Sequence, residues 1–339
     1  MGLPIRDLIV RSEIPWSSLA GRRLAIDGNN AMYQFLATIR QRDGQPFSDP
    51  EGRVTSHLMG VLYRTASLLS EGIGPVWVFD GRPPELKSGT LRARFLAKER
   101  AEAEWKEALD KGDLETARRK AAATSRFTRP MAAEAMELLK ALGVPTVQAP
   151  SEGEAQAARM AAEGAVWSAA SEDYDSLLFG APRLVRGLAA RPRGASQPPA
   201  QLVERERVLS DLGISEEELL MIGLLVGTDF NDGAKGYGPK RSLALVRRHL
   251  GWSETLKVGG LPEEEARAVA EIFRSPEVVP SPPIAFGEID EAQVDRILVE
   301  GHGFSQDRVH ATLSKARAGA EALHRPHDGR KQALLDAFP

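Results

Sequence analysis

Two pairs of acidic residues are the part of this sequence best suited to chemistry. In each pair a single residue separates the two carboxylates, and all four acids fall within 24 residues: Glu152, Glu154, Asp173 and Asp175. The segments on either side are apolar enough to be buried. A carboxylate that leaves water must be paired or bound to a cation, because otherwise its pKa rises until it is neutral. The two pairs therefore predict a divalent-metal site.

A helix cap is the competing interpretation of the first pair. Ser151 and Glu154 have the spacing of a capping box, which would start a helix over Ala155–Ala162 and explain Glu154 without a metal. Glu152 in the first turn would favour the helix dipole.

The positions of other acids favour the metal site. Asp173 follows the apolar run 165–170, where a strand should end, and ligands of open parallel sheets bind at the carboxyl ends of strands. Asp27 and Asp80 also close apolar strands, although a lone Asp-Gly pair is usually a turn. A seventh candidate ligand, Asp229, ends the motif Val-Gly-Thr-Asp after a helical segment.

Helix and strand patterns alternate along the chain. Strands are expected over residues 22–28, 75–81, 144–149 and 165–170. Helices are expected over residues 29–40, 56–70, 91–110, 114–126, 131–142, 214–225 and 242–250, with more within 260–320. Residues 182–199 are rich in Pro, Gly and Arg and suggest a surface hairpin or loop. The alternation predicts an α/β fold with a mostly parallel sheet and right-handed crossovers, which gathers the acids at one edge.

Composition limits the class of protein. The 339 residues are 42% hydrophobic and 27% charged, as in globular proteins of one elaborated domain or two. The absence of cysteine excludes thiolate zinc sites, disulfides and thiol catalysis. No apolar run reaches the roughly 18 residues that span a bilayer, and no signal peptide is expected. These features fit a cytosolic protein.

Basic charge is concentrated in two segments although the net charge is −3. Residues 87–130 carry twelve Lys or Arg against seven Asp or Glu, and Lys87, Arg92 and Arg94 follow Asp80 closely enough to reach a phosphate. Their alternative role is that of ordinary solvated helix charges. Residues 231–250 carry five basic residues against one acid. Separate acidic and basic regions suit an enzyme that handles phosphodiesters.

A glycine turn lies in the second basic segment. Gly236 and Gly238 precede a helix, so their backbone N–H groups could hold a phosphate at the positive end of its dipole. Such a turn is a weak motif by itself. Lys240 and Arg241 beside it favour a clamp on a nucleic-acid backbone.

With these segments placed, the sequence closely resembles the archaeal flap endonucleases, a family of structure-specific 5′ nucleases. The resemblance covers nearly the whole chain and is most specific over residues 33–36, 55–60, 78–84, 149–158, 173–180 and 226–229. It implies a 5′-nuclease-like core with a mostly parallel sheet, a helical arch over the active site and a helix–two-turn–helix DNA clamp. The implied divisions are an N-terminal nuclease region 1–98, an arch 99–130, an internal nuclease region with the clamp 131–258, C-terminal helices 259–323 and a tail 324–339.

The resemblance also implies a two-metal centre. One Mg²⁺ would be served by Asp27, Asp80, Glu152 and Glu154, and the second by Asp173, Asp175 and Asp229. Mn²⁺ is a possible substitute. Two such ions activate a water, orient the scissile phosphate and stabilise the leaving oxygen. Mg²⁺ keeps several waters, so some carboxylates would act from the outer shell. Lys87 and Arg94 occupy the family's basic arch positions and would neutralise charge that develops on the phosphate.

DNA contacts carried over from the family fall elsewhere in the chain. Tyr33 would stack on a base near the cleavage point, its alternative being a core tyrosine. The remaining positions are Gly2 near the DNA, Thr55, Ser56 and His57 at a 3′-flap pocket, and Gly236, Gly238, Lys240 and Arg241 at the duplex clamp. A monovalent cation such as K⁺ would be held there by carbonyls around Gly233, Ala234 and Tyr237. His57 could equally be a satisfied buried histidine.

The C-terminal tail resembles the family's sliding-clamp-binding peptide. Gln332, Leu335 and Phe338 are in register, but Pro339 stands where a second aromatic is usual. Losing one aromatic anchor should weaken clamp binding. The alternative is an amphipathic tail without a partner.

These observations favour a Mg²⁺-dependent 5′ flap endonuclease with 5′→3′ exonuclease activity, acting in replication and repair in the cytoplasm of an archaeal cell. One rival is a relative that prefers bubbles, gaps or four-way junctions. Another is a catalytically silent junction-binding adaptor, and a third is a phosphatase that uses the same acids. The seven acids argue against the adaptor, and the glycine turn argues against the phosphatase.

Overall fold

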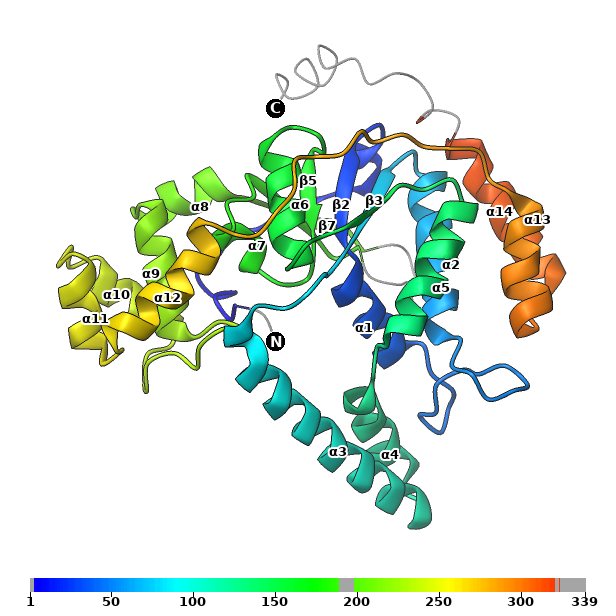
Figure 1. Ribbon diagram of the computed structural model, residues 1–339, viewed down its shortest axis with the longest axis horizontal. Coiled ribbons are helices and arrows are strands. Elements are labelled where there is room, and N and C mark those ends of the chain that lie inside the picture. Colours follow the sequence, from blue (N-terminus) through cyan, green and yellow to red (C-terminus); the bar gives the residue numbers. More distant parts are fainter. Residues whose placement is uncertain (1–2, 189–197, 321–322, 324–339) are drawn as a thin grey trace.

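A seven-stranded sheet forms the centre of the computed structural model, which describes residues 3–188, 198–320 and 323 (Figure 1). Its strand order is β1-β7-β6-β5-β2-β3-β4. The strands are β1 (Ser12–Ile14), β2 (Arg23–Asp27), β3 (Gly74–Phe79), β4 (Thr146–Gln148), β5 (Ser168–Ala170), β6 (Arg183–Arg186) and β7 (Ala200–Glu204). Strands β4, β3, β2, β5 and β6 run parallel, while β7 is antiparallel to β6 and β1. The mostly parallel sheet is confirmed, and the segment predicted as a hairpin or loop supplies β6 and leads to β7.

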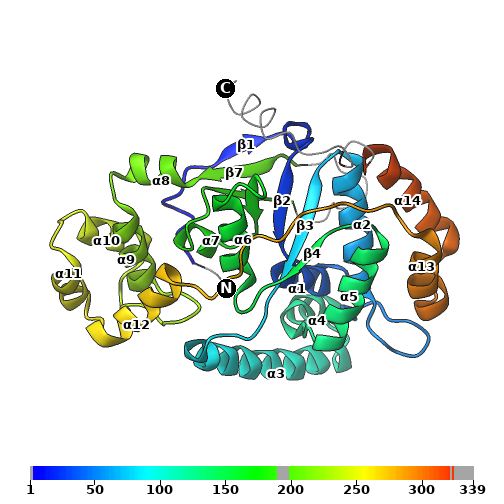
Figure 2. The same ribbon diagram turned by 45° about the horizontal axis from the view of Figure 1, so that its top comes forward.

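Each face of the sheet carries its own hydrophobic core, because successive side chains of a strand point to opposite faces. In β3, Val76 and Val78 belong to one core and Trp77 and Phe79 to the other. The first core is covered by α6 (Gly153–Ala162), α7 (Asp175–Leu178), α8 (Arg205–Leu212), α9 (Glu216–Val226) and α12 (Glu263–Arg274). The second is covered by α1 (Gly28–Thr38), α2 (Ser56–Ser70), α5 (Arg129–Ala141), α13 (Glu291–Asp295) and α14 (Gln306–Ala320) (Figure 2).

A pair of helices projects from this body below the carboxyl edge of the sheet (Figure 1). It consists of α3 (Ser88–Asp110) and α4 (Leu114–Ala121), which run beside each other. Their buried residues are small alanines: Ala101 and Ala108 on α3, and Ala117 and Ala121 on α4. Helix α3 is continuous across residues 98 and 99, the expected start of the arch.

The second basic segment lies in a helical group at the left-hand end of the molecule in Figure 1, opposite α13 and α14. Helices α10 (Pro239–Val246) and α11 (Trp252–Gly259) pack with α9 and α12. The chain then crosses the body in an extended segment before α13 (Figure 2). No helix of the described residues is both long and apolar enough to cross a membrane.

Candidate metal centre at the carboxyl edge of the sheet

The structure brings six of the seven predicted acids to one cavity of about 770 Å³. Its acidic residues are Asp27 at the end of β2, Asp80 after β3, Glu152 and Glu154 at the start of α6, Asp173 after β5, and Asp229 after α9. The seventh acid, Asp175, is buried beside them as the first residue of α7 and accepts a hydrogen bond from the Leu3 backbone N–H at 3.0 Å. The parallel sheet therefore gathers acids that lie up to about two hundred residues apart in sequence.

Two glycines allow the backbone segments that carry Asp80 and Glu152 to approach each other closely. The Gly153 N–H donates to Asp80 Oδ1 at 2.8 Å, and a Cβ at this position would lie at the same short distance from that oxygen. A Cβ at Gly81 would lie 2.3 Å from two backbone carbonyl oxygens of the opposite segment. The capping-box interpretation is wrong, since Glu152 is the N-cap of α6 and makes no capping hydrogen bond, and the first N–H of the helix donates to Asp80 instead.

Three polar side chains that the sequence analysis did not select hold the carboxylates in place. Asn29 donates to Asp80 at 2.7 Å, and Asn30 donates to Asp173 at 2.7 Å. The Ser171 hydroxyl lies 3.0 Å from a carboxylate oxygen of Asp27 and 3.3 Å from one of Glu154. Asn29 and Asn30 directly follow the Asp27-Gly28 pair. Their place at the start of a helix, just after a strand that ends in an acid, could have identified them as site residues.

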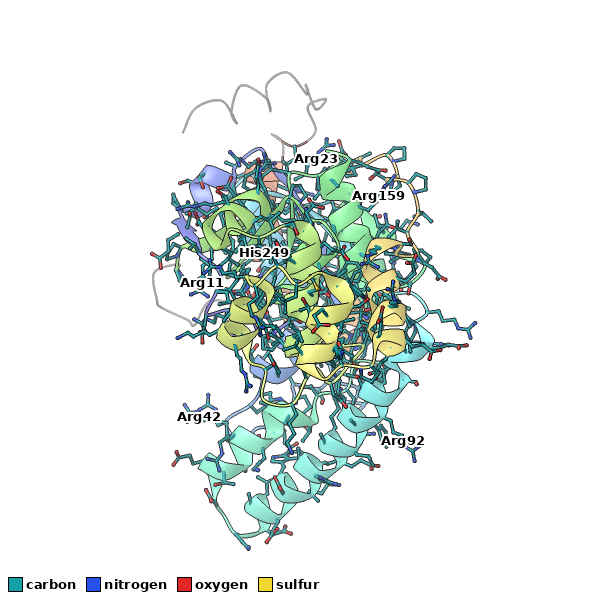
Figure 3. The ribbon with its side chains drawn as sticks, turned by 90° about the vertical axis from the view of Figure 1, so that its left-hand side faces the viewer. Arg11, Arg23, Arg42, Arg92, Arg159 and His249 are labelled. Atoms are coloured by element: carbon teal, nitrogen blue, oxygen red, sulfur yellow. The ribbon has the colours of Figure 1, made fainter. Side chains whose placement is uncertain are left out.

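Lys87 and Arg94 reach into the same acidic group. Lys87 is only 8% exposed, forms an ion pair with Glu152 and lies 3.7 Å from Asp229 Oδ2. Arg94 Nη2 lies 2.5 Å from Asp229 Oδ1. Their alternative role as solvated helix charges is therefore wrong. Arg92 differs, because it is exposed and projects away from the helix pair into solvent (Figure 3).

Burial sets the electrostatics of the carboxylates. Desolvation, followed by repulsion from Asp80, raises the pKa of Asp27 to about 7. Desolvation and then Asp229 raise the pKa of Asp175 to about 8, and desolvation also raises the pKa of Glu154 well above its ordinary value. Burial would lower the pKa of Lys87, but Glu152, Asp80 and Asp229 together outweigh the burial and the pKa rises. Seven acids with two basic partners leave a negative excess that cations would neutralise.

The donor chemistry suits a hard divalent ion, since carboxylate oxygens are the ligands that Mg²⁺ prefers. Among the described residues, however, no three His, Asp or Glu side chains already form a group that could hold a metal ion. Mg²⁺ retains several waters and binds few side chains directly, so such a group is not required.

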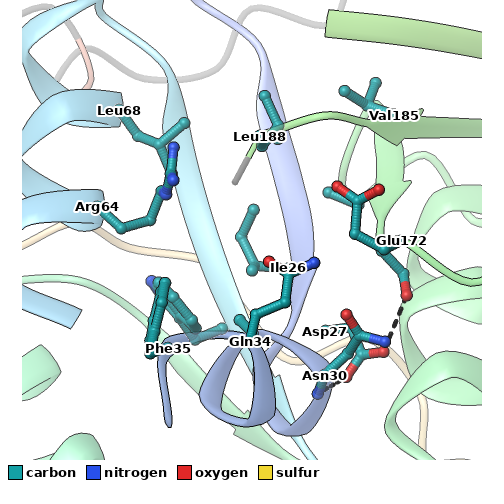
Figure 4. A pocket seen from close by; sticks show the side chains of 14 residues that line it. Ile26, Asp27, Asn30, Gln34, Phe35, Arg64, Leu68, Glu172, Val185 and Leu188 are labelled. Atoms are coloured by element: carbon teal, nitrogen blue, oxygen red, sulfur yellow. Dashed lines mark hydrogen bonds between the residues drawn. The ribbon is translucent and has the colours of Figure 1, made fainter. Parts of the chain in front are cut away.

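A second, smaller cavity of about 40 Å³ lies behind Asp27 (Figure 4). Asp27 and Asn30 lie on one side of it, and Arg64 and Leu68 on the other. This volume holds water but no nucleotide. Of these two cavities, only the larger has room for a nucleotide-sized molecule beside the acids.

The residues expected at the 3′-flap pocket are buried at the start of α2. The Ser56 hydroxyl donates to the Ile39 carbonyl at 2.7 Å and accepts from the Phe47 N–H at 2.9 Å, and the Thr55 N–H donates to the Phe47 carbonyl at 2.8 Å. These bonds hold the loop before α2 against the body. The His57 side chain is 0% exposed and faces a carboxylate oxygen of Glu134, but neither ring nitrogen makes a hydrogen bond to the described residues.

The buried His57 ring predicts a pH-dependent loss of stability. Desolvation, followed by His302, lowers its pKa from 6.5 to about 4, although Nε2 lies 3.3 Å from a carboxylate oxygen of the partly exposed Glu134. Desolvation dominates because Glu134 is screened by solvent. The unfolded chain binds the proton near pH 6.5 and the folded protein does not, so stability falls as pH decreases from 6.5 to 4.

Replacing His57 with glutamine should remove this pH dependence. Between pH 7 and pH 5 the wild-type protein should lose about 2 kcal/mol more unfolding free energy than His57→Gln. Urea unfolding of both proteins at the two pH values measures this difference, and any constant cost of the substitution cancels. Equal pH dependence in both proteins would show that folding leaves the pKa of His57 unchanged, and would contradict the prediction.

The glycine turn leads directly into a helix, as the sequence predicts. Gly236 has a positive φ of 82°, Gly238 is the N-cap of α10, and Pro239 occupies its first turn. The Arg241 guanidinium lies 4.5 Å from the centre of the Tyr237 ring, and Lys240 is exposed. The Ala234 carbonyl accepts from the Tyr237 N–H at 3.0 Å. The other expected contacts, Gly2, Gln332, Leu335, Phe338 and Pro339, lie outside the described residues.

Tyr33 lies at the surface and not in a core. It is 40% exposed and lines the large cavity. Its ring meets that of Phe127 edge to face, with 6.0 Å between centres, and Lys98 Nζ lies 4.4 Å from the Tyr33 ring centre. The alternative of a core tyrosine is therefore wrong.

Comparisons with known proteins agree over most of the chain. A model of the XPG N-terminal domain matches residues 6–101, and a model of the XPG I-region matches residues 143–229. The chain is 43% identical over 348 residues to flap endonuclease 1 of Pyrococcus horikoshii, a match that covers 100% of this chain and 98% of that protein. It is 46% identical over 332 residues to flap endonuclease 1 of Aeropyrum pernix, with 93% and 94% covered.

Solved structures show the same architecture. The flap endonuclease-1 from Methanococcus jannaschii matches with a TM-score of 0.76 and 40% identity, covering 94% of this chain and 99% of that one. The catalytic core of Rad2 in complex with a DNA substrate matches with a TM-score of 0.68 at 23% identity, covering 90% and 96%, which shows the shared fold.

Proposed function

Because this chain belongs to the flap endonuclease family, we propose that it holds two divalent cations with its seven acids and uses them to cut the 5′ strand at flap junctions. Its activity is that of a structure-specific 5′ flap endonuclease in DNA replication and repair. The observation that carries the proposal is the convergence of six acids, Lys87 and Arg94 on one cavity at the sheet edge.

The resemblance to the family assigns the seven acids to two cations. Asp27, Asp80, Glu152 and Glu154 would hold one Mg²⁺, and Asp173, Asp175 and Asp229 would hold the other. When bound, the pair supplies an activated water and neutralises the phosphate. Asn29, Asn30 and Ser171 keep the carboxylates oriented through the hydrogen bonds described above. Raised pKa values mean that the acids must release protons as cations bind.

Lys87 and Arg94 exchange partners in this proposal. In the structure they form ion pairs with Glu152 and Asp229. Bound cations would take over that charge, and Lys87 and Arg94 would then be available to stabilise the charge that develops on the scissile phosphate in the transition state. Because both groups line the cavity through which the strand approaches, this exchange requires no rearrangement of the fold.

The remaining residues position the DNA. Tyr33 would stack on a base beside the cut. The N–H groups around Gly236 and Gly238, with Lys240 and Arg241, would hold a duplex strand, and the neighbouring carbonyls would hold a K⁺. The segment Thr55–His57 would shape a 3′-flap pocket, and the tail would bind a sliding clamp weakly. These contacts read backbone and junction shape, not base sequence.

Cleavage of a labelled double-flap DNA tests the proposal. Incubation with Mg²⁺ should release the 5′ flap with a cut near its base, a nicked duplex should be shortened from its 5′ end, and EDTA should abolish both reactions. Bubble, gapped and four-way DNA serve as competing substrates. Faster cutting of one of these would favour the rival nuclease, and tight binding without cleavage would leave only the adaptor.

A further inference from the structure

A phenylalanine on the projecting helix faces the same cavity as the acids. Phe95 of α3 is 49% exposed, lines the cavity and belongs to neither hydrophobic core. Leu91, one turn earlier, also lines the cavity. The neighbouring Leu96 is similarly exposed, at 46%, but is not among the lining residues. The side of α3 that faces the cavity therefore carries an aromatic ring that is not part of either hydrophobic core.

Aromatic rings and cations are paired on two walls of this cavity. The guanidinium of Arg126, in the segment before α5, lies 5.2 Å from the centre of the Phe95 ring of α3. Opposite it, Lys98 Nζ of α3 lies 4.4 Å from the centre of the Tyr33 ring of α1. All four side chains line the cavity. Proteins that bind single strands combine such rings, on which bases stack, with cations that follow the backbone.

We propose that Phe95 is a stacking position for an unpaired base of the 5′ flap, separate from the position at Tyr33. The inference rests on the proposed function, because it identifies how the same cavity receives the strand. Arg126 and Lys98 pair with the phosphates on either side of the stacked base. Stacking is tolerant of sequence since every base has a π-face, so Phe95 favours unpaired over paired strands without selecting a sequence.

The contacts of the helix pair exclude a purely structural role. Helices α3 and α4 meet through the buried alanines at positions 101, 108, 117 and 121, and Phe95 lies outside that contact. Replacing an exposed side chain there leaves the pair packed. Three variants separate stacking from simple apolar contact: Phe95→Ala removes the ring, Phe95→Leu keeps an apolar group, and Phe95→Trp keeps an aromatic face. Leu96→Ala is the matched control on the same helix.

The binding test uses 2-aminopurine placed at successive flap positions, with Ca²⁺ in place of Mg²⁺. Stacking quenches the fluorescence of this base. Wild type and Phe95→Trp should quench it at a flap position beyond the one affected by Tyr33→Ala, and Phe95→Ala and Phe95→Leu should lose this quenching. Leu96→Ala should retain it. Quenching that survives in Phe95→Ala would overturn the proposal.

The cleavage test compares an intact flap with one that lacks the base at that position. Phe95→Ala should slow single-turnover cleavage of the intact flap about tenfold and leave that of the abasic flap unchanged. Equal slowing of both would assign Phe95 to packing and sink the stacking role. Quenching by a wild-type protein that does not cleave would instead refute the nuclease proposal alone.

Discussion

Replacing Asp173 with alanine is expected to slow cleavage of double-flap DNA about a thousandfold in Mg²⁺, because a cation that loses a ligand can no longer activate water and neutralise the phosphate. Binding of the same DNA in Ca²⁺ should persist or tighten, since the substitution removes one negative charge from a cavity that receives phosphates. Single-turnover cleavage and a band-shift titration measure the two effects separately. Asn30 would lose its partner but keep its place on α1.

Asp232→Ala is the matched control for this substitution. Asp232 is an exposed acid three residues after Asp229, and it does not line the cavity. The control should cleave like the wild-type protein. If Asp173→Ala retained cleavage within about tenfold of wild type, the catalytic cations would have to lie elsewhere.

Replacing Lys87 with methionine is expected to have the second largest effect. Cleavage should fall about a hundredfold, because a buried cation aimed at the developing phosphate charge is lost. Without cations, the variant should also be less stable than wild type, since Glu152 and Asp229 lose a positive partner in a desolvated site. Added Mg²⁺ should narrow this difference by replacing the missing charge. Thermal unfolding with EDTA and with Mg²⁺ measures the change.

Lys106→Met is the matched control, because it removes the same positive charge from an exposed position. Lys106 lies on α3, the helix that Lys87 immediately precedes, and its ion pair with Glu102 is exposed. Such surface pairs contribute little to stability, so this variant should match wild type in both assays. A stability difference for Lys87→Met that Mg²⁺ leaves unchanged would contradict the exchange of partners proposed for Lys87.

The seven acids could be chosen from the sequence because their position is a local property. Asp27 and Asp80 each close a short apolar run, and a parallel sheet places all such ends at one edge. Helix α2 was predicted with its observed bounds, Ser56–Ser70, since its apolar spacing needs no distant partner. The resemblance to flap endonucleases, carried by the same stretches, is confirmed by the family matches.

Where the sequence allowed two interpretations of a residue, the tertiary structure decided between them. Ser151 and Glu154 have capping-box spacing, but the approach of Gly81 fixes the backbone of that segment and Glu152 becomes the cap. Charged positions on a polar helix look alike in sequence, yet folding buries Lys87 against Glu152 and leaves Arg92 in solvent. Phe95 and Arg126, thirty-one residues apart, form one wall of the cavity because α3 and α4 return the chain on itself. Spacing along the chain determines secondary structure and the sheet edge, whereas burial and partnership depend on contacts between distant segments, which no local pattern encodes.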